Sequence, residues 1–256
     1  MPSNPLVRLL PAPLRAWLRS RKKALERNLI VFDRVTDFSV LQRTKPYRAE
    51  LGGRRGSYID RYYIEQFLIE HRDAIRGVVA EIQSDEYTSR FGAGRVTRTE
   101  IIDINPANAN RTLALDLTDT EAAPEAAFDC IVCTQTLLLI PDYNAAIRTI
   151  HAMLKPGGVA LVTVPGISPV IRGGLVAGEG EDCWRFTTRS ARSDFARVFG
   201  ESQVEARSYG NVLTAVAFLH GLVQEELTAG ELAYNDPDYE LIVAVAATRK
   251  AGDGRS

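Results

Sequence analysis

Residues 128–166 constrain the fold of this chain more than any other segment. They read as a buried strand over residues 129–134, a polar turn, an amphipathic helix and a second buried strand that begins with VALVTV. Pro156 cannot continue the helix, and Gly157 and Gly158 allow a positive φ before the second strand. Two buried strands joined by a helix form a right-handed crossover in a parallel sheet. The segment therefore predicts a βαβ unit.

The alternation of strands and helices continues on both sides of this unit. Further strands are predicted over residues 78–82, 96–104, 111–117, 203–210 and 238–250. Helices are predicted over residues 59–75, 84–91, 186–200 and 211–227. This order is typical of an open, doubly wound α/β sheet, here with seven mostly parallel strands. The last two strands lack room for the usual crossover pattern, which predicts an antiparallel C-terminal strand in the far half of the sheet.

Composition fits one moderately large domain, because 256 residues with 45% hydrophobic content can bury a full core. Cys130 and Cys133 form a C-x-x-C pattern inside a strand, which places their side chains on opposite faces. We therefore expect a reduced, structural pair rather than a redox or zinc site. No spaced cluster of His or acidic residues predicts a metal site. The sequence contains no secretory leader and no membrane-spanning apolar run, so a cytoplasmic location is expected.

Charge divides the chain into a basic N-terminal extension and an acidic remainder. Residues 1–56 contain 13 Lys and Arg against 4 Asp and Glu, so they carry +9 within a chain of net charge −1. Within this extension, residues 14–29 predict a helix with one apolar and one basic face. Such a helix could lie on an anionic membrane or a partner, or pack on its own acidic domain over residues 57–250. Residues 251–256 form a short tail. Nothing in the sequence supports nucleic-acid binding.

Eight short blocks resemble one family of enzymes. They are RYYIE (61–65), EIQSDEYT (81–88), TQTL (134–137), KPGG (155–158), TVPGIS (163–168), WRFT (184–187), YGNVL (209–213) and DPDYE (236–240). In this order they resemble class I S-adenosylmethionine-dependent methyltransferases. The resemblance is to the type 11 methyltransferase-domain proteins that accompany bacterial glycosyltransferases. It covers about residues 57–250 and implies a Rossmann-like methyltransferase fold with S-adenosylmethionine as cofactor. It also implies that residues 14–29 could contact a glycosyltransferase.

The resemblance also implies a cofactor site at the carboxyl ends of the strands, where doubly wound sheets bind their ligands. The residues implied are Glu81, Gln83 and Ser84 near the methionine end, Asp103 and Ile104 at the ribose, Asp116 and Leu117 at the adenine, and Gln135 and Thr136 as the floor. A carboxylate such as Asp103 accepts two hydrogen bonds from a diol, with Glu100 as an alternative. Each carboxylate could instead be a solvated strand end or a helix cap.

The turn after the first strand departs from the family pattern. Methyltransferases place glycine there so that the main chain can approach the cofactor, whereas this chain has Gln83 and no glycine over residues 81–91. Asp85 and Glu86 put negative charge at a helix start, which disfavours an anionic phosphate ligand. That argues against dinucleotides more than against S-adenosylmethionine. The substitution leaves a catalytically silent protein as an alternative.

Acceptor chemistry is predicted from two places in the sequence. Asp182, Trp184 and Arg185 lie in a Gly-rich loop and could hold a sugar by stacking and hydrogen bonding. The alternative is that Trp184 and Phe186 only anchor the next helix. His220 is a weak candidate for a general base, with a packing role as the alternative.

Two functions of different class follow from these patterns. The first is an S-adenosylmethionine-dependent methyltransferase that methylates an oxygen of a sugar, a polysaccharide intermediate or another small molecule. The second is a catalytically silent methyltransferase-fold module that binds or scaffolds glycan-biosynthesis partners. A nicotinamide-dependent oxidoreductase is disfavoured, because no G-x-G-x-x-G motif lies between a strand and a helix.

Overall fold

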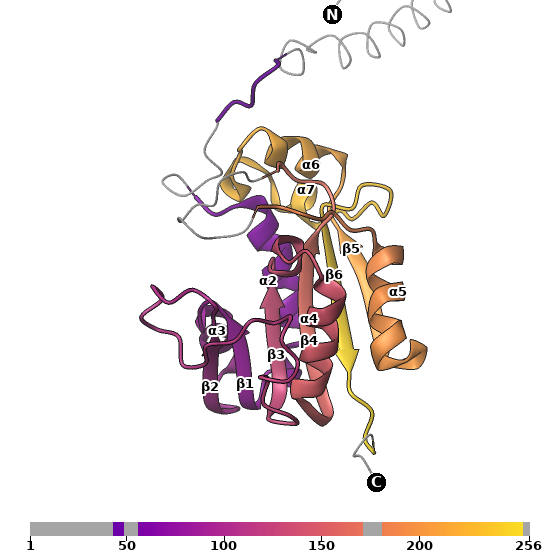
Figure 1. Cartoon of the computed structure of the whole chain (residues 1–256). Helices are drawn as coiled ribbons and strands as arrows, with labels where there is room; N and C mark the ends of the chain where they lie inside the picture. Colours follow the sequence, from indigo (N-terminus) through magenta and orange to yellow (C-terminus); the bar gives the residue numbers. More distant parts are fainter. Residues whose placement is uncertain (1–42, 49–55, 171–180, 253–256) are drawn as a thin grey trace, which may run out of the picture. The chain divides into compact units, whose positions relative to one another are not determined.

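The computed structural model describes residues 43–48, 56–170 and 181–252 (Figure 1). The chain divides into two compact units, Met1–Pro46 and Tyr47–Ser256, and the second holds every helix and strand given below. The amphipathic segment 14–29, and with it the expected membrane or partner contact, lies outside the described residues.

A single mixed sheet forms the centre of the second unit. Its strands are β1 (Gly77–Ile82), β2 (Val96–Ile102), β3 (Phe128–Thr134), β4 (Leu154–Pro165), β5 (Val204–Tyr209) and β6 (Ile242–Thr248). They lie in the order β2-β1-β3-β4-β6-β5. The first four pair in parallel, whereas β6 is antiparallel to both β4 and β5. The doubly wound fold class and the inserted antiparallel C-terminal strand are therefore confirmed.

The predicted seventh strand is wrong. Residues 111–117 run beside the end of β2 but form only an isolated bridge, between Leu113 and Ile102. The main-chain hydrogen bonds to β2 and the residue after it are concentrated at Leu113. Its N–H donates to the carbonyl of Ile101, and its carbonyl accepts the N–H of Asp103, both at 3.1 Å. Beyond it the chain turns, because Asp116 accepts the N–H of Thr118. The sheet of the described residues therefore has six strands.

The βαβ unit has the predicted elements with different boundaries. Helix α4 spans Tyr143–Met153 and joins β3 to β4. The Lys-Pro-Gly-Gly block lies within the first residues of β4 rather than before the strand. A Cβ at Gly158 would lie 2.9 Å from the carbonyl oxygen of Phe128, so glycine permits this close approach of the two strands. The predicted polar turn after β3 contains the short 3-10 helix η3 (Leu137–Leu139), which is apolar.

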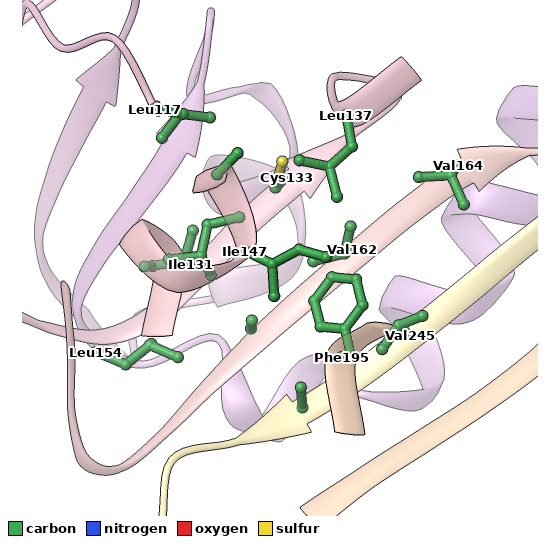
Figure 2. Close-up of a cluster of buried hydrophobic side chains, with 14 of the residues drawn as sticks. Leu117, Ile131, Cys133, Leu137, Ile147, Leu154, Val162, Val164, Phe195 and Val245 are labelled. Atoms are coloured by element: carbon green, nitrogen blue, oxygen red, sulfur yellow. The ribbon is translucent and has the colours of Figure 1, made fainter. Parts of the chain in front are cut away.

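Helices cover both faces of the sheet. On one face lie α4 and α5 (Thr188–Phe199), which place Ile147 and Phe195 against β3, β4 and β6 (Figure 2). The opposite face is covered by α2 (Ile59–Glu70), α3 (Glu86–Gly92) and α6 (Val212–Leu219). The segment after β5 was expected to be one long helix, but α6 ends at Leu219, and Gly221 follows with a φ of 72°. The short helix α7 (Ala229–Ala233) was not predicted.

The two strand cysteines lie as expected. Cys130 belongs to the apolar cluster on the α2 face and Cys133 to the cluster on the α4 face, and both are buried and free. Burial raises the pKa of the Cys133 thiol to about 12 and raises the pKa of Cys130 as well. Neither thiol is therefore poised as a nucleophile near neutral pH.

The described residues include no helix with the length and apolarity to span a bilayer. They also include no group of three or more His, Cys, Asp or Glu side chains placed to hold a metal ion.

Replacing Ile147 with Ala should destabilise the domain by about 2–5 kcal/mol, because the side chain is fully buried between α4 and the sheet. The free energy of unfolding, from urea denaturation, measures the loss. The neighbouring exposed residue provides the control, since Arg148→Ala should cost no more than about 0.5 kcal/mol. Equal losses for the two variants would contradict this packing.

Candidate functional site

A cavity of about 720 Å³ opens where β1, β2 and β3 end. Six of the nine residues implied as cofactor contacts line it: Gln83, Asp103, Ile104, Asp116, Leu117 and Thr136. The other three, Glu81, Ser84 and Gln135, are not among the lining residues. Parallel strands bring their carboxyl ends to the same edge of the sheet, which gathers residues from distant parts of the chain at one place.

The turn after β1 has a left-handed main chain without glycine. Gln83 has a φ of 69°, a conformation that glycine adopts freely and other residues rarely adopt. Its N–H donates to the carbonyl of Ile102 at 2.9 Å, and its own carbonyl accepts from Nδ2 of Asn108 at 2.8 Å. The chain thus keeps, with Gln83, the conformation for which a glycine was expected.

Glu81, two residues before Gln83, binds the first turn of α3 through hydrogen bonds. Its buried carboxylate accepts the N–H of Tyr87 at 3.1 Å and of Thr88 at 2.7 Å, which otherwise lack partners at the start of the helix. The hydroxyl of Ser84 lies 3.5 Å from the same carboxylate. Burial raises the pKa of Glu81, and the hydrogen bonds from Thr88 and Tyr87 offset part of that rise. Glu81 therefore holds the start of α3, and the turn that leads into it, in place.

Asp103 follows β2 and is buried, with 8% of its surface exposed. Its Oδ1 accepts the N–H of Asn105 at 2.8 Å, and its Oδ2 accepts from Nδ2 of Asn108 at 2.7 Å. Glu100, the alternative, instead bonds the hydroxyl of Thr112 and does not line the cavity. The structure thus places Asp103, and not Glu100, in the cavity wall.

Asp116 also lines the cavity. Its Oδ1 accepts both the N–H and the hydroxyl of Thr118 at 2.8 Å, so part of this carboxylate orders its own turn. Leu115 and Leu117 on either side are buried and line the cavity. The arrangement presents a carboxylate between two aliphatic side chains.

The two residues after β3 have different surroundings. Thr136 lines the cavity, and its hydroxyl donates to the carbonyl of Thr134 at 3.1 Å. Gln135 bonds toward β4 instead: its N–H donates to the carbonyl of Thr163 at 2.8 Å. The rest of this wall comes from residues that were not predicted as site residues: Leu139, Ile140, Pro141, Asp142 and Ala145. Their place directly after TQT, at the carboxyl end of a strand, was the signal that could have found them.

The three residues proposed for the acceptor are held largely by contacts within the protein. Arg185 donates to Asp182 and to the carbonyl of Pro169, both at 2.6 Å. The indole N–H of Trp184 donates at 3.0 Å to the carbonyl of Ile140, a cavity residue, while the side chain stays 40% exposed. Trp184 therefore adjoins the cavity wall and packs edge-on against Tyr143, while part of the residue stays exposed.

The weak candidate base lies elsewhere. His220 caps the C-terminal end of α6, and its ring packs edge-on against Tyr47 with centroids 5.9 Å apart. It is not among the residues that line the cavity. This environment favours a packing role for His220 over a role as a general base.

Comparison with known proteins identifies the family. A sequence profile described as a methyltransferase domain matches residues 26–205, which include every residue that lines the cavity. The chain belongs to this methyltransferase family. A comparison with curated proteins gave no significant match.

Solved structures of methyltransferases and one cyclase are similar at low identity. An S-adenosylmethionine dependent methyltransferase from Mesorhizobium loti shares 16% identity over 75% of this chain and 98% of its own, with a TM-score of 0.48. The 1,6-didemethyltoxoflavin-N1-methyltransferase of Burkholderia thailandensis, crystallised with 1,6-didemethyltoxoflavin and S-adenosylhomocysteine, shares 15% over 94% and 92%, with a TM-score of 0.47. The cyclase SpnF shares 16% over 87% and 94%, with a TM-score of 0.49. The family assignment of this methyltransferase-domain chain rests on the sequence match.

The raised pKa of Glu81 predicts a specific pH dependence of stability. A carboxyl whose folded-state pKa exceeds its unfolded value of about 4.3 contributes stability that is present below that value and lost as pH rises through the folded pKa. Glu81→Gln has no such titration. The difference in unfolding free energy, wild type minus variant, should therefore fall as pH rises from about 4 into the window above it.

Chemical denaturation at a series of pH values measures this difference. Asn110→Ala provides the control, because the side chain of Asn110 is exposed and has no titratable group. The difference between wild type and Asn110→Ala should stay nearly constant over the same range. A constant or rising difference for Glu81→Gln would contradict the buried carboxylate.

Proposed function

We propose that this chain is an S-adenosylmethionine-dependent methyltransferase and that the cavity at the ends of β1, β2 and β3 holds the cofactor. S-adenosylmethionine is the cofactor of the family. The observation that carries the proposal is the placement of Asp103 and Asp116 on the wall of one cavity whose other lining is largely aliphatic.

The residues present fit this cofactor. A cavity of about 720 Å³ lies in the range of about 300–1,000 Å³ that is usual for small-molecule sites. The aliphatic side chains of Ile82, Leu115 and Leu117 suit the faces of an adenine ring. Asp103 offers a buried carboxylate to a diol, and Asp116 offers an acceptor to an exocyclic amine.

When bound, the cofactor supplies a sulfonium methyl group for in-line displacement by an acceptor atom. The contribution of the chain is then mainly to position the two reactants. Asp103 and Asp116 hold the nucleoside end, while the Gln83 turn sets the place of the methionine end. A positively charged ligand end is also favoured beside Asp85 and Glu86, whose carboxylates would repel a phosphate.

Gln83 is compatible with this function because its main chain already has the left-handed conformation that the turn needs. The side chain is the remaining difference from a glycine, and it lines the cavity. The alternative, a silent module that scaffolds glycan-assembly partners, requires that this side chain blocks the cofactor. Binding measurements therefore separate the two functions.

The proposed acceptor is an oxygen of a sugar, a polysaccharide intermediate or another small molecule. The likeness to type 11 proteins that accompany glycosyltransferases supports a sugar, and so does Trp184, which is partly exposed beside the cavity wall. The Asp182–Arg185 ion pair would stiffen the loop that carries this residue. The basic segment 14–29 is proposed to contact a membrane or a glycosyltransferase.

Isothermal titration with S-adenosylhomocysteine tests the cofactor site. Asp103→Asn replaces a carboxylate acceptor with an amide, so the affinity should fall about tenfold or more, as hydrogen bonds to charged groups contribute roughly 1.5–3 kcal/mol. Glu100→Gln is the matched control, because Glu100 lies in β2 three residues before Asp103 and does not line the cavity; this variant should bind within about twofold of the wild type. A wild-type chain that fails to bind at millimolar ligand would sink the enzyme proposal in favour of the silent module.

Methyl transfer to candidate acceptors tests the substrate class. Wild-type protein, supplied with methyl-labelled S-adenosylmethionine, should label nucleotide sugars or lipid-linked glycans and leave nucleic acid unlabelled. Trp184→Ala should raise the KM for such an acceptor by up to about tenfold, because stacking contributes roughly 0.5–1.5 kcal/mol, with the cofactor affinity unchanged. Labelling of protein or nucleic acid alone would overturn the glycan assignment.

A further inference from the structure

One amide side chain joins the turn after β1 to the carboxylate after β2. Asn108 donates from Nδ2 to the carbonyl of Gln83 at 2.8 Å and to Oδ2 of Asp103 at 2.7 Å. Its Oδ1 accepts the N–H of Asn110 at 3.0 Å. Both amide hydrogens and the amide oxygen are therefore used, and a flipped amide would lose all three bonds.

We propose that Asn108 is a positioning residue for S-adenosylmethionine, which holds the Gln83 turn and the Asp103 carboxylate in one fixed arrangement. The inference rests on the proposed function of the cavity. Asn108 does not itself line that cavity, so it acts through the two residues that do.

The first argument concerns the main chain of Gln83. A residue with a side chain keeps a φ of 69° only where its surroundings hold it there, since glycine alone adopts that conformation freely. Both main-chain polar groups of Gln83 form hydrogen bonds. Its N–H donates to the carbonyl of Ile102 in β2, and its carbonyl accepts from the side-chain amide of Asn108. Asn108 thus forms one of the two hydrogen bonds that hold Gln83 in a conformation that a glycine would adopt freely.

The second argument concerns the carboxylate of Asp103. Each carboxylate oxygen has about two lone-pair directions, and here one direction on each oxygen is taken, by Asn105 and by Asn108. The carboxylate is buried in the cavity wall, so its remaining lone-pair directions can accept hydrogen bonds from a ligand in the cavity. Asn108 therefore fixes the rotation of the carboxylate and leaves one acceptor direction on each oxygen for the two hydroxyls of a ribose.

The test is titration of S-adenosylhomocysteine into the full chain and three variants. Asn108→Ala should weaken binding about tenfold or more, because it frees both the turn and the carboxylate. Asn108→Asp keeps the shape but removes the donors and sets a carboxylate against another acceptor, so it should weaken binding more than Ala. Asn110→Ala, in the same loop, is the matched control and should bind within about twofold of the wild type.

A rescue experiment separates positioning from a merely structural role. Adding Gln83→Gly to Asn108→Ala should recover part of the lost affinity, because glycine holds the turn without strain. Thermal unfolding of each variant shows that it is folded. A side chain that only fills space predicts that Asp binds better than Ala and that Gln83→Gly rescues nothing; either result overturns the proposal.

Failure of this inference is distinguishable from failure of the proposed function. If the wild type binds S-adenosylhomocysteine and Asn108→Ala binds it equally well, only the role of Asn108 is refuted. If the folded wild type does not bind at millimolar ligand, the cofactor site is refuted and the role of Asn108 with it.

Discussion

The parallel pairing of β1 with β2 and β3 is the constraint on which the site depends. Because the three strands run in the same direction, residues from positions 82 to 145 meet at one edge of the sheet. The last residue of β2 also accepts the N–H of Gln83, so strand pairing continues into the turn. Without this register the carboxylates after β2 and the turn after β1 would not share a cavity.

Glu81 and Asp103 show that buried carboxylates near strand ends can have different roles. Glu81 points beneath the turn and satisfies main-chain N–H groups of α3, whereas Asp103 lies in the cavity wall. Both are buried, yet the main-chain N–H donors of Glu81 belong to one helix and the donors of Asp103 belong to one loop. The first orders the scaffold, and the second is available to a ligand.

Part of the candidate site could be anticipated from the sequence. The family resemblance implied Asp103, Asp116 and Thr136, and all three lie in the cavity wall. Strand geometry supports only Asp103 and Thr136, because residues 111–117 before Asp116 do not form a strand. Asn108 could not be anticipated, since a loop Asn is also an ordinary turn former. The wall after β3 was misread as a polar turn, although Leu137–Leu139 form an apolar 3-10 helix. Residues 111–117 alternate like a strand but pair at only one bridge.

The sequence by itself determined the elements that depend on local pattern: most of the buried strands and the amphipathic helices between them. Those follow from periodicity and from Pro and Gly chemistry, which act over a few residues. Only the tertiary structure decided that Gln83 keeps a left-handed turn, that Glu81 faces α3 and that Asn108 joins Gln83 to Asp103. These depend on groups brought together across the sheet, and side-chain direction at a strand end is set by such neighbours rather than by the strand itself.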